Sequence, residues 1–533
     1  MTGGFRFFGP APRGMAHTLV WGASFALMAG AAQAAGPAAG LLVTLRPGVV
    51  ALESVSPAPV VAREGAQALR DREHATWQRN QALRVSHLAA VAAQAGVPVR
   101  ALGSAGQALR VDLADTSPAG LEAASRRLRL HPDVLDVVPN ERLHRTQVAP
   151  VIPNDTHFSR QWHLQSPASF AGALNMPPAW AKWTGASHPV TVAVVDSGVR
   201  PNHPDLAANL LPGHDFVSEL PYANDGDGRD ADASDPGDWV SAAEASTALF
   251  EGCDAENSSW HGTAIAGEIA AVSQNATGVA GVNWGAKVVP VRVAGKCGAV
   301  LSDLLDGVRW AAGLPVAGVP SNPHPAHIIN LSYGGSGACN FAYQTMVNDV
   351  RNAGALLVVA AGNDGGPLTR PADCSGVMAV TAVRGDGAKA SYGNYGTQVA
   401  LAAPGGSAVP GTDFGLAATL DSGAQGPVAP AYAEVAGTSF SAPLVAGVAS
   451  LVLGIQPNLS VSQLEGLLKG AVRPHTVQAT LAQCSATTLS QGECNCTTQT
   501  CGAGLLDADL AVTAAQAMGS SSGDGAGTGS SDT

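Results

Sequence analysis

The stretch "VAGTSFSAPLVAGVASLVL", residues 435 to 453, places Ser439 at the start of a long run of small and apolar residues. The apolar residues recur at helical spacing, and Pro443 is expected in the first turn, where its missing N–H is tolerated. A helix should therefore begin near Ser439, and its free N–H groups and dipole would stabilise negative charge beside the hydroxyl. Taken alone, the stretch favours a simpler interpretation, in which Ser439 is an ordinary helix N-cap.

Length and charge limit what the chain can be. It has 533 residues, 46% apolar and 13% charged, which is typical of a globular protein larger than one ordinary domain. Residues 148 to 533 carry 14 basic and 31 acidic residues, net −17, whereas residues 36 to 147 carry 13 arginines and 10 acidic residues, net +3. The acidic larger part argues against nucleic acid or an anionic membrane as a partner.

The first 34 residues have the pattern of a secretory (Sec) signal peptide. Arg6 and Arg13 precede an apolar run over residues 19 to 32, and Ala32-Gln33-Ala34 follows as a small-residue cleavage site. The run is too short to span a membrane. We therefore expect a secreted protein, with the periplasm or the cell surface as other destinations.

If the protein is exported, its cysteines are expected to form disulfides. In an oxidising compartment an even number of cysteines indicates disulfides, with buried free thiols as the alternative. Zinc is less favoured, because "CNC" lacks the usual two-residue gap and no histidine follows at ligand spacing. Neighbour order suggests two early pairs, with the last four cysteines bonded among themselves. The eight cysteines are Cys253 with Cys297, Cys339 with Cys374, and then Cys484, Cys494, Cys496 and Cys501.

Residues 35 to 147 are predicted to form a separate small α+β domain. Strand-like runs cover 41 to 47, 107 to 115 and 133 to 144, and helix-like runs lie near 63 to 95 and 118 to 130. Residues 146 to 155 are typical of an extended linker that a protease could cut. At the other end, residues 518 to 533 are rich in Gly and Ser and are expected to have no regular structure.

Residues 148 to 517 are predicted to form the main domain, of the α/β class. Six apolar runs alternate with helix-like segments, and they are strands buried on both faces, as in a mostly parallel sheet sandwiched by helices. The runs are "TVAVVDSG", "AKVVPVRV", "AHIINLSYGG", "ALLVVAAGN", "VMAVTAV" and "QVALAAPGG". In such sheets the active crevice lies at the carboxyl ends of the strands.

Four polar residues stand at the ends of these strands or at helix starts: Asp196, His261, Asn363 and Ser439. Each has an ordinary alternative, since Asp196 and Asn363 fit turns and His261 fits a cap or a satisfied polar group. Together they supply what acyl transfer by serine needs. A histidine takes the serine proton, a carboxylate fixes the imidazole, and the Ser439 N–H with the Asn363 amide would hold the oxyanion.

On these residues the chain resembles the subtilisin-like serine proteases, or subtilases, of the secreted bacterial type. Matching blocks run in the family's order through residues 150 to 515, among them "VAVVDSGV", "HGTAIAG", "VVAAGN" and "GTSFSAPLVAGVASL". The resemblance implies that Asp196, His261 and Ser439 are the catalytic triad and that Asn363 completes the oxyanion hole. Ala264 stands where the family usually has a second histidine, so altered packing is expected there. The implied substrate-binding residues are Ser332, Tyr333, Gly334, Gly335, Ala360, Ala361 and Gly362.

The resemblance extends to the N-terminal segment and to metal. It implies that residues 35 to 147 are an inhibitory propeptide that is cut off, so the expected partners are this propeptide and protein or peptide substrates. Calcium is expected as a structural ion, and no organic cofactor is expected. Its expected ligands lie in the acidic loop 224 to 239, with a solvated loop as the alternative and with 273 to 278 as a second candidate site. The four ligands are Asp225, Asp227, Asp230 and Asp232.

The predicted function is a secreted, monomeric serine endopeptidase made as a self-processing zymogen. Two alternatives remain open at this stage. An inactive scaffold could bind peptides in the same cleft, although it would have no chemical need for all four residues. A transpeptidase of the same fold would have to shield its acyl-enzyme from water.

Overall fold

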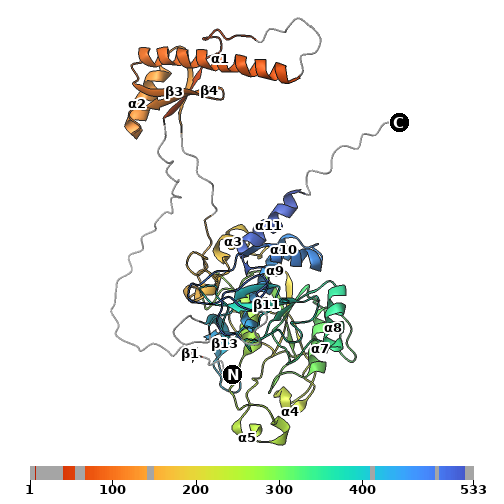
Figure 1. Ribbon diagram of the computed structural model, residues 1–533. Helices are drawn as coiled ribbons and strands as arrows, with labels where there is room; N and C mark the ends of the chain where they lie inside the picture. The colour runs from red at the N-terminus through yellow and green to blue at the C-terminus, as the bar shows by residue number, and fades with distance from the viewer. Residues whose placement is uncertain are drawn as a thin grey trace, which may run out of the picture. The chain divides into compact units, whose positions relative to one another are not determined.

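The computed structural model describes residues 6–7, 40–54, 66–140, 149–407, 415–485 and 491–521. They form two compact units, one within Gly14–Gln147 and a larger one that runs from Val148 (Figure 1). The predicted signal peptide lies outside the described residues except for β1 (Arg6–Phe7), which pairs antiparallel with β14 (Pro430–Val435).

The smaller unit is an α+β domain with one antiparallel sheet in the order β3-β4-β2-β5. Its elements are β2 (Leu41–Leu45), α1 (Ala66–Gln94), β3 (Val99–Ala105), β4 (Ala108–Leu113), α2 (Pro118–Arg129) and β5 (Val134–Pro139). Strand β3 was not predicted, because "VRALGSA" is short of large apolar residues and is mostly exposed. It forms because Gly106, at φ +61°, reverses the chain into β4.

The larger unit is built on a nine-stranded sheet in the order β15-β16-β12-β11-β10-β9-β6-β8-β7. All six predicted strands are present, and every pair in the sheet is parallel except β15 with β16. The α/β class is confirmed. The strands are β6 (Thr191–Asp196), β7 (His214–Asp215), β8 (Lys287–Arg292), β9 (Ile328–Leu331), β10 (Leu356–Ala360), β11 (Met378–Val383), β12 (Leu401–Pro404), β15 (Val472–Arg473) and β16 (Leu505–Leu506).

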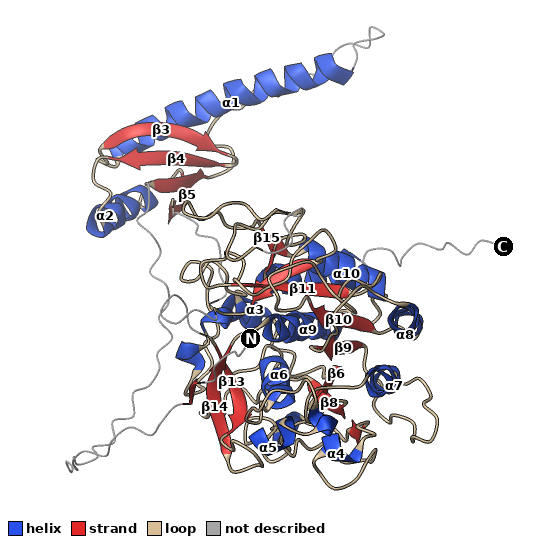
Figure 2. Cartoon of the chain, turned by 60° about the horizontal axis from the view of Figure 1, so that its bottom comes forward, coloured by secondary structure: helices blue, strands red, loops and turns tan. Residues whose placement is uncertain are grey.

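Helices cover both faces of this sheet (Figure 2). In β6, Val192 and Val194 face a core shared with α6 (His261–Ala270) and α9 (Thr438–Ile455). Ala193 and Val195 face a second core under α7 (Leu301–Ala311) and α8 (Phe341–Asn352). Because side chains alternate along a strand, apolar residues at every position are what a doubly covered strand requires.

Helix α9 is the central helix of the domain. It has the length and hydropathy of a membrane span, but 89% of that window is buried inside the protein, as in a core helix. It packs against α6, against α11 (Ala508–Ser521) and against strands β9 to β12. The predicted helix is therefore confirmed, but Pro443 is wrongly placed in the prediction, because it lies inside the helix, beyond the first turn.

The remaining elements complete the unit. A hairpin of β13 (Leu416–Asp421) and β14 packs on α6. The other helices are α3 (Met176–Lys182), α4 (Leu220–Ala223), α5 (Ala242–Ala245) and α10 (Val461–Gly470), with 3-10 turns at Phe158–Arg160, Trp162–Leu164, Ala207–Asn209 and Ala248–Phe250. Helix α11 continues to Ser521, so it takes the first residues of the predicted tail, whose remainder lies outside the described residues.

The end of the predicted linker is bound to the larger unit. The Val151 N–H donates to the Pro177 carbonyl, and the Asp155 side chain is buried. Residues 151 to 155 form no helix or strand, but they do not make up a free linker.

Candidate active site

Three neighbouring strands bring predicted site residues to one edge of the sheet. Strand β9 lies between β6 and β10, and Leu331 is in register with Val195 on one side and Val359 on the other. Asp196, Ser332 and Ala360 therefore lie at one level, at the carboxyl ends of their strands. This is the place where a parallel sheet opens a crevice.

Asp196 and His261 form a hydrogen-bonded pair. The imidazole Nδ1 lies 2.7 Å from the Asp196 Oδ1, which also accepts the Ser197 N–H. His261 is the first residue of α6, and Asp196 is fully buried. Gly262 allows the close approach of helix and strand, because a Cβ there would lie 2.1 Å from the Gly198 carbonyl oxygen. The alternative of His261 as a helix cap is wrong, because Trp260 occupies the N-cap position.

Nearby acidic groups control the charge of the His261 imidazole. Burial alone would lower its pKa, but the Asp196 charge and hydrogen bond outweigh burial, and the charges of Asp238 and Asp235 add to them. The pKa of His261 is therefore raised above its usual value. The fixed Nδ1 contact leaves Nε2 as the proton acceptor of the neutral ring.

Ser439 is the second residue of α9, after Gly437 at the N-cap, so the N-cap alternative for Ser439 is wrong. The residue is 8% exposed, and its hydroxyl lies 3.4 Å from the Ser332 carbonyl oxygen. No hydrogen bond joins Ser439 to His261 among the described residues. The His261 ring lies over the start of α9, with its centroid 5.4 Å from that of Phe440.

The interior proline explains a contact between Ser332 and Ser439. Pro443 has no N–H to donate to the Ser439 carbonyl one turn earlier. The Ser332 hydroxyl donates to that carbonyl instead, at 2.9 Å, and accepts from the Asn330 side chain. The end of β9 is thereby attached to the start of α9.

Asn363 has its side chain fixed by the residue before Ser439. Its Oδ1 accepts from the Thr438 N–H and from the Thr438 hydroxyl, both at 2.9 Å. The hydroxyl in turn accepts the Gly362 N–H at 3.1 Å. Because the carbonyl side of the amide is held in this way, the Nδ2 group is left to donate beside the start of α9. Thr438 was not predicted, since only the folded contact gives it a role.

The predicted substrate-binding residues differ in exposure. Gly334 is exposed, and Tyr333 is half-buried with its ring 5.6 Å from that of His261. The Gly335 N–H donates to the Arg370 carbonyl, so it is already paired within the protein. Ala360 and Gly362 are partly exposed, whereas Ala361 is fully buried in the core under α7 and α8.

The four predicted calcium ligands do not form one site. No three of these carboxylates lie within 4.8 Å of one another in the part of the chain that the structure describes. Asp225 pairs with the buried Arg292, which also binds Asp215. Asp230 and Asp232 each accept a backbone N–H two residues further on. Arginine and local turns thus offset much of the charge of this loop.

The second candidate loop fits calcium better. Asp155 and Asp205 are both buried beside residues 274 to 279. Burial raises the pKa of Asp155 in spite of backbone hydrogen bonds that lower it, and the Asp205 charge raises it further. Two buried carboxylates supply oxygen ligands of the kind that a hard cation binds, and they also accept the N–H groups of Gln274 and Val279.

The cysteines are paired as their order suggested. The disulfides are Cys253–Cys297, Cys339–Cys374, Cys484–Cys494 and Cys496–Cys501, and no described cysteine is free.

Comparison with known proteins agrees with this geometry. The sequence profile of the Subtilase family matches residues 187–504. The chain belongs to the subtilase family. As a subtilase it is a serine endopeptidase, so the predicted family and enzyme class are confirmed.

Individual subtilases show how far the similarity extends. An extracellular protease of Xanthomonas campestris is 41% identical over 464 residues, which cover 86% of this chain and 72% of the relative. Thermitase of Thermoactinomyces vulgaris is 33% identical over 305 residues, or 56% of this chain and 85% of thermitase. A solved protease structure from Pseudoalteromonas arctica is 45% identical with a TM-score of 0.61, and covers 68% of this chain and 100% of its own.

Proposed function

We propose that this subtilase hydrolyses peptide bonds with Ser439 as nucleophile, His261 as general base and Asp196 as the group that orients the imidazole. The hydrogen bond between His261 Nδ1 and Asp196, with the ring over the start of α9, is the observation that carries the proposal. Nε2 takes the Ser439 proton as Oγ attacks the carbonyl carbon, and then gives it to the departing amine. Water hydrolyses the acyl-enzyme by the same steps and restores Ser439.

Substrate must first release the Ser439 hydroxyl from its long contact with the Ser332 carbonyl. Catalytic hydrogen bonds are often loose before substrate binds, so this geometry is compatible with the proposed role. As the tetrahedral intermediate forms, the Ser439 N–H and the Asn363 Nδ2 donate to its oxyanion.

A covalent probe tests the proposal. A fluorophosphonate, which reacts with activated serines, should label the full chain once, on the peptide that contains Ser439. Labelling should be lost in Ser439→Ala and slowed in His261→Ala. Ser441→Ala is the matched control, because Ser441 lies on the same helix and is fully buried, so the probe should not reach it. Labelling on another residue would contradict the assignment.

The proposal includes export and a zymogen. The signal peptide pattern and the extracellular protease among the relatives support export, and the separate α+β unit supports a propeptide over residues 35 to 147. N-terminal sequencing of the secreted protein should give a start near residue 148. A start near residue 35 in active protein would contradict the zymogen model.

Calcium belongs to the proposal as a structural ion. Asp155 and Asp205 would hold it, and its charge would offset theirs. Chelation should lower the unfolding temperature of the wild type, and Asp205→Asn should remove that sensitivity. Asp227→Asn, in the acidic loop, is the control and should keep it. An unfolding temperature that is the same with calcium and with chelator would contradict the site.

A further inference from the structure

Asn394 binds the loop that carries Asn363 on both sides of that residue. Its backbone N–H donates to the Gly362 carbonyl at 2.9 Å. Its side-chain Oδ1 accepts the N–H groups of Asp364 at 2.9 Å and of Gly366 at 3.1 Å. Asn394 is fully buried, so water cannot replace these bonds without opening the structure.

The Asn394 side chain also lies directly against Gly362. A Cβ on Gly362 would lie 2.3 Å from the Asn394 Nδ2, and Gly362 has φ +104°, a conformation that glycine adopts without strain. The backbone just before Asn363 is therefore shaped by the amide of Asn394.

Asn394 is itself held by two neighbours. The Thr381 hydroxyl, in β11, donates to the Asn394 carbonyl at 2.6 Å. Lys389 is fully buried, and its Nζ donates to the carbonyls of Ala390 and Gly393, both at 2.9 Å. These bonds close the turn that leads into Asn394, and the Lys389 ammonium lies 5.0 Å from the centre of the Tyr395 ring.

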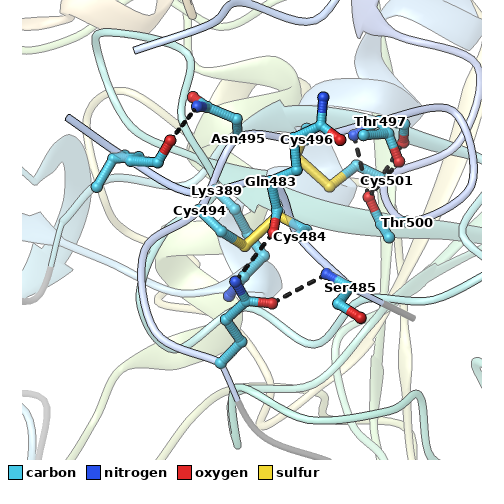
Figure 3. The surroundings of a disulfide bond; sticks show 12 residues. Lys389, Gln483, Cys484, Ser485, Cys494, Asn495, Cys496, Thr497, Thr500 and Cys501 are labelled. Carbon is cyan, nitrogen blue, oxygen red and sulfur yellow. Dashed lines mark hydrogen bonds between the residues drawn. A yellow bond between two sulfur atoms is a disulfide. The ribbon is translucent and has the colours of Figure 1, made fainter. Parts of the chain in front are cut away.

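A disulfide-closed segment supports the same turn. Lys389 lies beside the Cys484–Cys494 bridge, and its N–H donates to the Cys494 carbonyl at 3.1 Å (Figure 3). From the same segment, the Gln491 N–H donates to the Gly365 carbonyl at 2.9 Å. The loop that carries Asn363 is thus held between Asn394 and this segment.

We propose that Asn394 is a positioning residue of the oxyanion hole, whose side-chain carbonyl orients Asn363 by holding the amides that follow it. The inference rests on the proposed role of Asn363. Asn394 touches neither substrate nor the reacting atoms, so it acts only through the orientation of Asn363. Loss of its side chain should lower kcat and leave KM nearly unchanged, because the oxyanion exists mainly in the transition state.

A double-mutant cycle on the full chain tests the inference. Asn394→Ala should lower kcat about tenfold, and Asn394→Asp, which keeps an acceptor, should restore part of the loss. In the Asn363→Leu background, Asn394→Ala should have no further effect. If Asn394→Ala does not fold, Thr381→Val replaces it, with a smaller effect that must also vanish in that background.

Asn322→Ala is the matched control for stability. Asn322 is also buried and bonds backbone groups, but around Trp310 and His324. It should lower the unfolding temperature and leave kcat unchanged. Equal losses from Asn394→Ala in both backgrounds, or a loss of stability alone, would overturn the inference. A normal kcat in Asn363→Leu would instead overturn the proposed oxyanion role, and the inference with it.

Discussion

Helices in the larger unit begin in two different ways. At the starts of α8 and α10, a side chain caps the helix: Asn340 accepts the Tyr343 N–H, and Ser460 forms a reciprocal capping box with Gln463. At the starts of α6 and α9, the N-cap residues Trp260 and Gly437 make no side-chain cap, and distant side chains accept the first N–H groups instead: Ser197 that of Gly262, and Asn363 that of Thr438. The starts of α3, α4 and α7 also lack a capping side chain, and those of α6 and α9 are the ones that carry His261 and Ser439.

The difference matters most at the two starts that carry candidate site residues. A capping side chain satisfies N–H groups locally and stabilises the fold. A start without an N-cap side chain gives up part of that local stability, and at α9 it leaves the positive end of the helix dipole beside Ser439. Trp260 also costs conformational energy, because its φ of +52° lies in the left-handed region, which is unfavourable for a bulky side chain. Its ring is fully buried and its Nε1–H donates to the Gly423 carbonyl, and these contacts hold the residue in that conformation.

The largest expected effect is at the start of α9. Ser439→Ala removes the proposed nucleophile and should lower kcat by roughly a millionfold, the magnitude found for the nucleophile of subtilisin. Ser441→Ala, two residues later, should stay within about twofold of wild type. Hydrolysis of a peptide substrate measures both. Substantial activity in Ser439→Ala would show that the uncapped start has no catalytic purpose.

The next largest effect concerns the donor beside that helix. Asn363→Leu leaves the proposed triad untouched and should lower kcat by roughly a hundred- to a thousandfold, the range found for loss of an oxyanion donor in subtilisin, with KM little changed. Steady-state kinetics measure the effects on kcat and on KM separately. A kcat within threefold of wild type would assign Asn363 to an ordinary turn.

A smaller effect is expected at the start of α6. The His261 imidazole must be neutral to act as base, so activity should fall as the pH drops through its raised pKa. Asp238→Asn removes one of the charges that raise this pKa. The acid limb of kcat/KM should therefore move to lower pH.

Asp227→Asn is the control for this shift, because Asp227 is exposed and is not among the charges that act on His261. It should leave the acid limb in place. An unchanged limb in Asp238→Asn, or a shift to higher pH, would contradict the electrostatic account.

The smallest effect is expected at a capped start. Ser460→Ala in α10 should lower the free energy of unfolding by about 1 kcal/mol and leave kcat unchanged. Urea denaturation and kinetics on the same sample measure both quantities. A change in kcat of more than twofold would mean that capped and uncapped starts are not functionally distinct.

The sequence was sufficient for the sheet, and its candidate site residues include Asp196 and His261, which the structure joins by a hydrogen bond. Doubly buried strands such as 191 to 196 are marked by continuous apolar runs, and polar residues at their ends mark the crevice. Contacts between distant segments could not be predicted, because no local pattern encodes them. The bonds of Asn363 to Thr438 and of Asn394 to Asp364 are of this kind.

The pairing of charged side chains was equally beyond prediction from local sequence. The density of Asp residues between 224 and 239 predicted a calcium site, yet Arg292 from a distant strand neutralises part of that loop. Asp155 and Asp205 are far apart in sequence, and only the fold brings them beside residues 274 to 279. Local composition reports how much charge is present, but not which opposite charge it meets.

Trapping the acyl-enzyme tests the central claim most directly. Wild-type protein is mixed with an activated ester, quenched in acid within milliseconds and digested for mass analysis. The account predicts an acyl group on the peptide that contains Ser439, and a longer-lived adduct at pH values below the pKa of His261, where the protonated imidazole cannot activate water. No adduct, or an adduct on another residue that persists in Ser439→Ala, would contradict it.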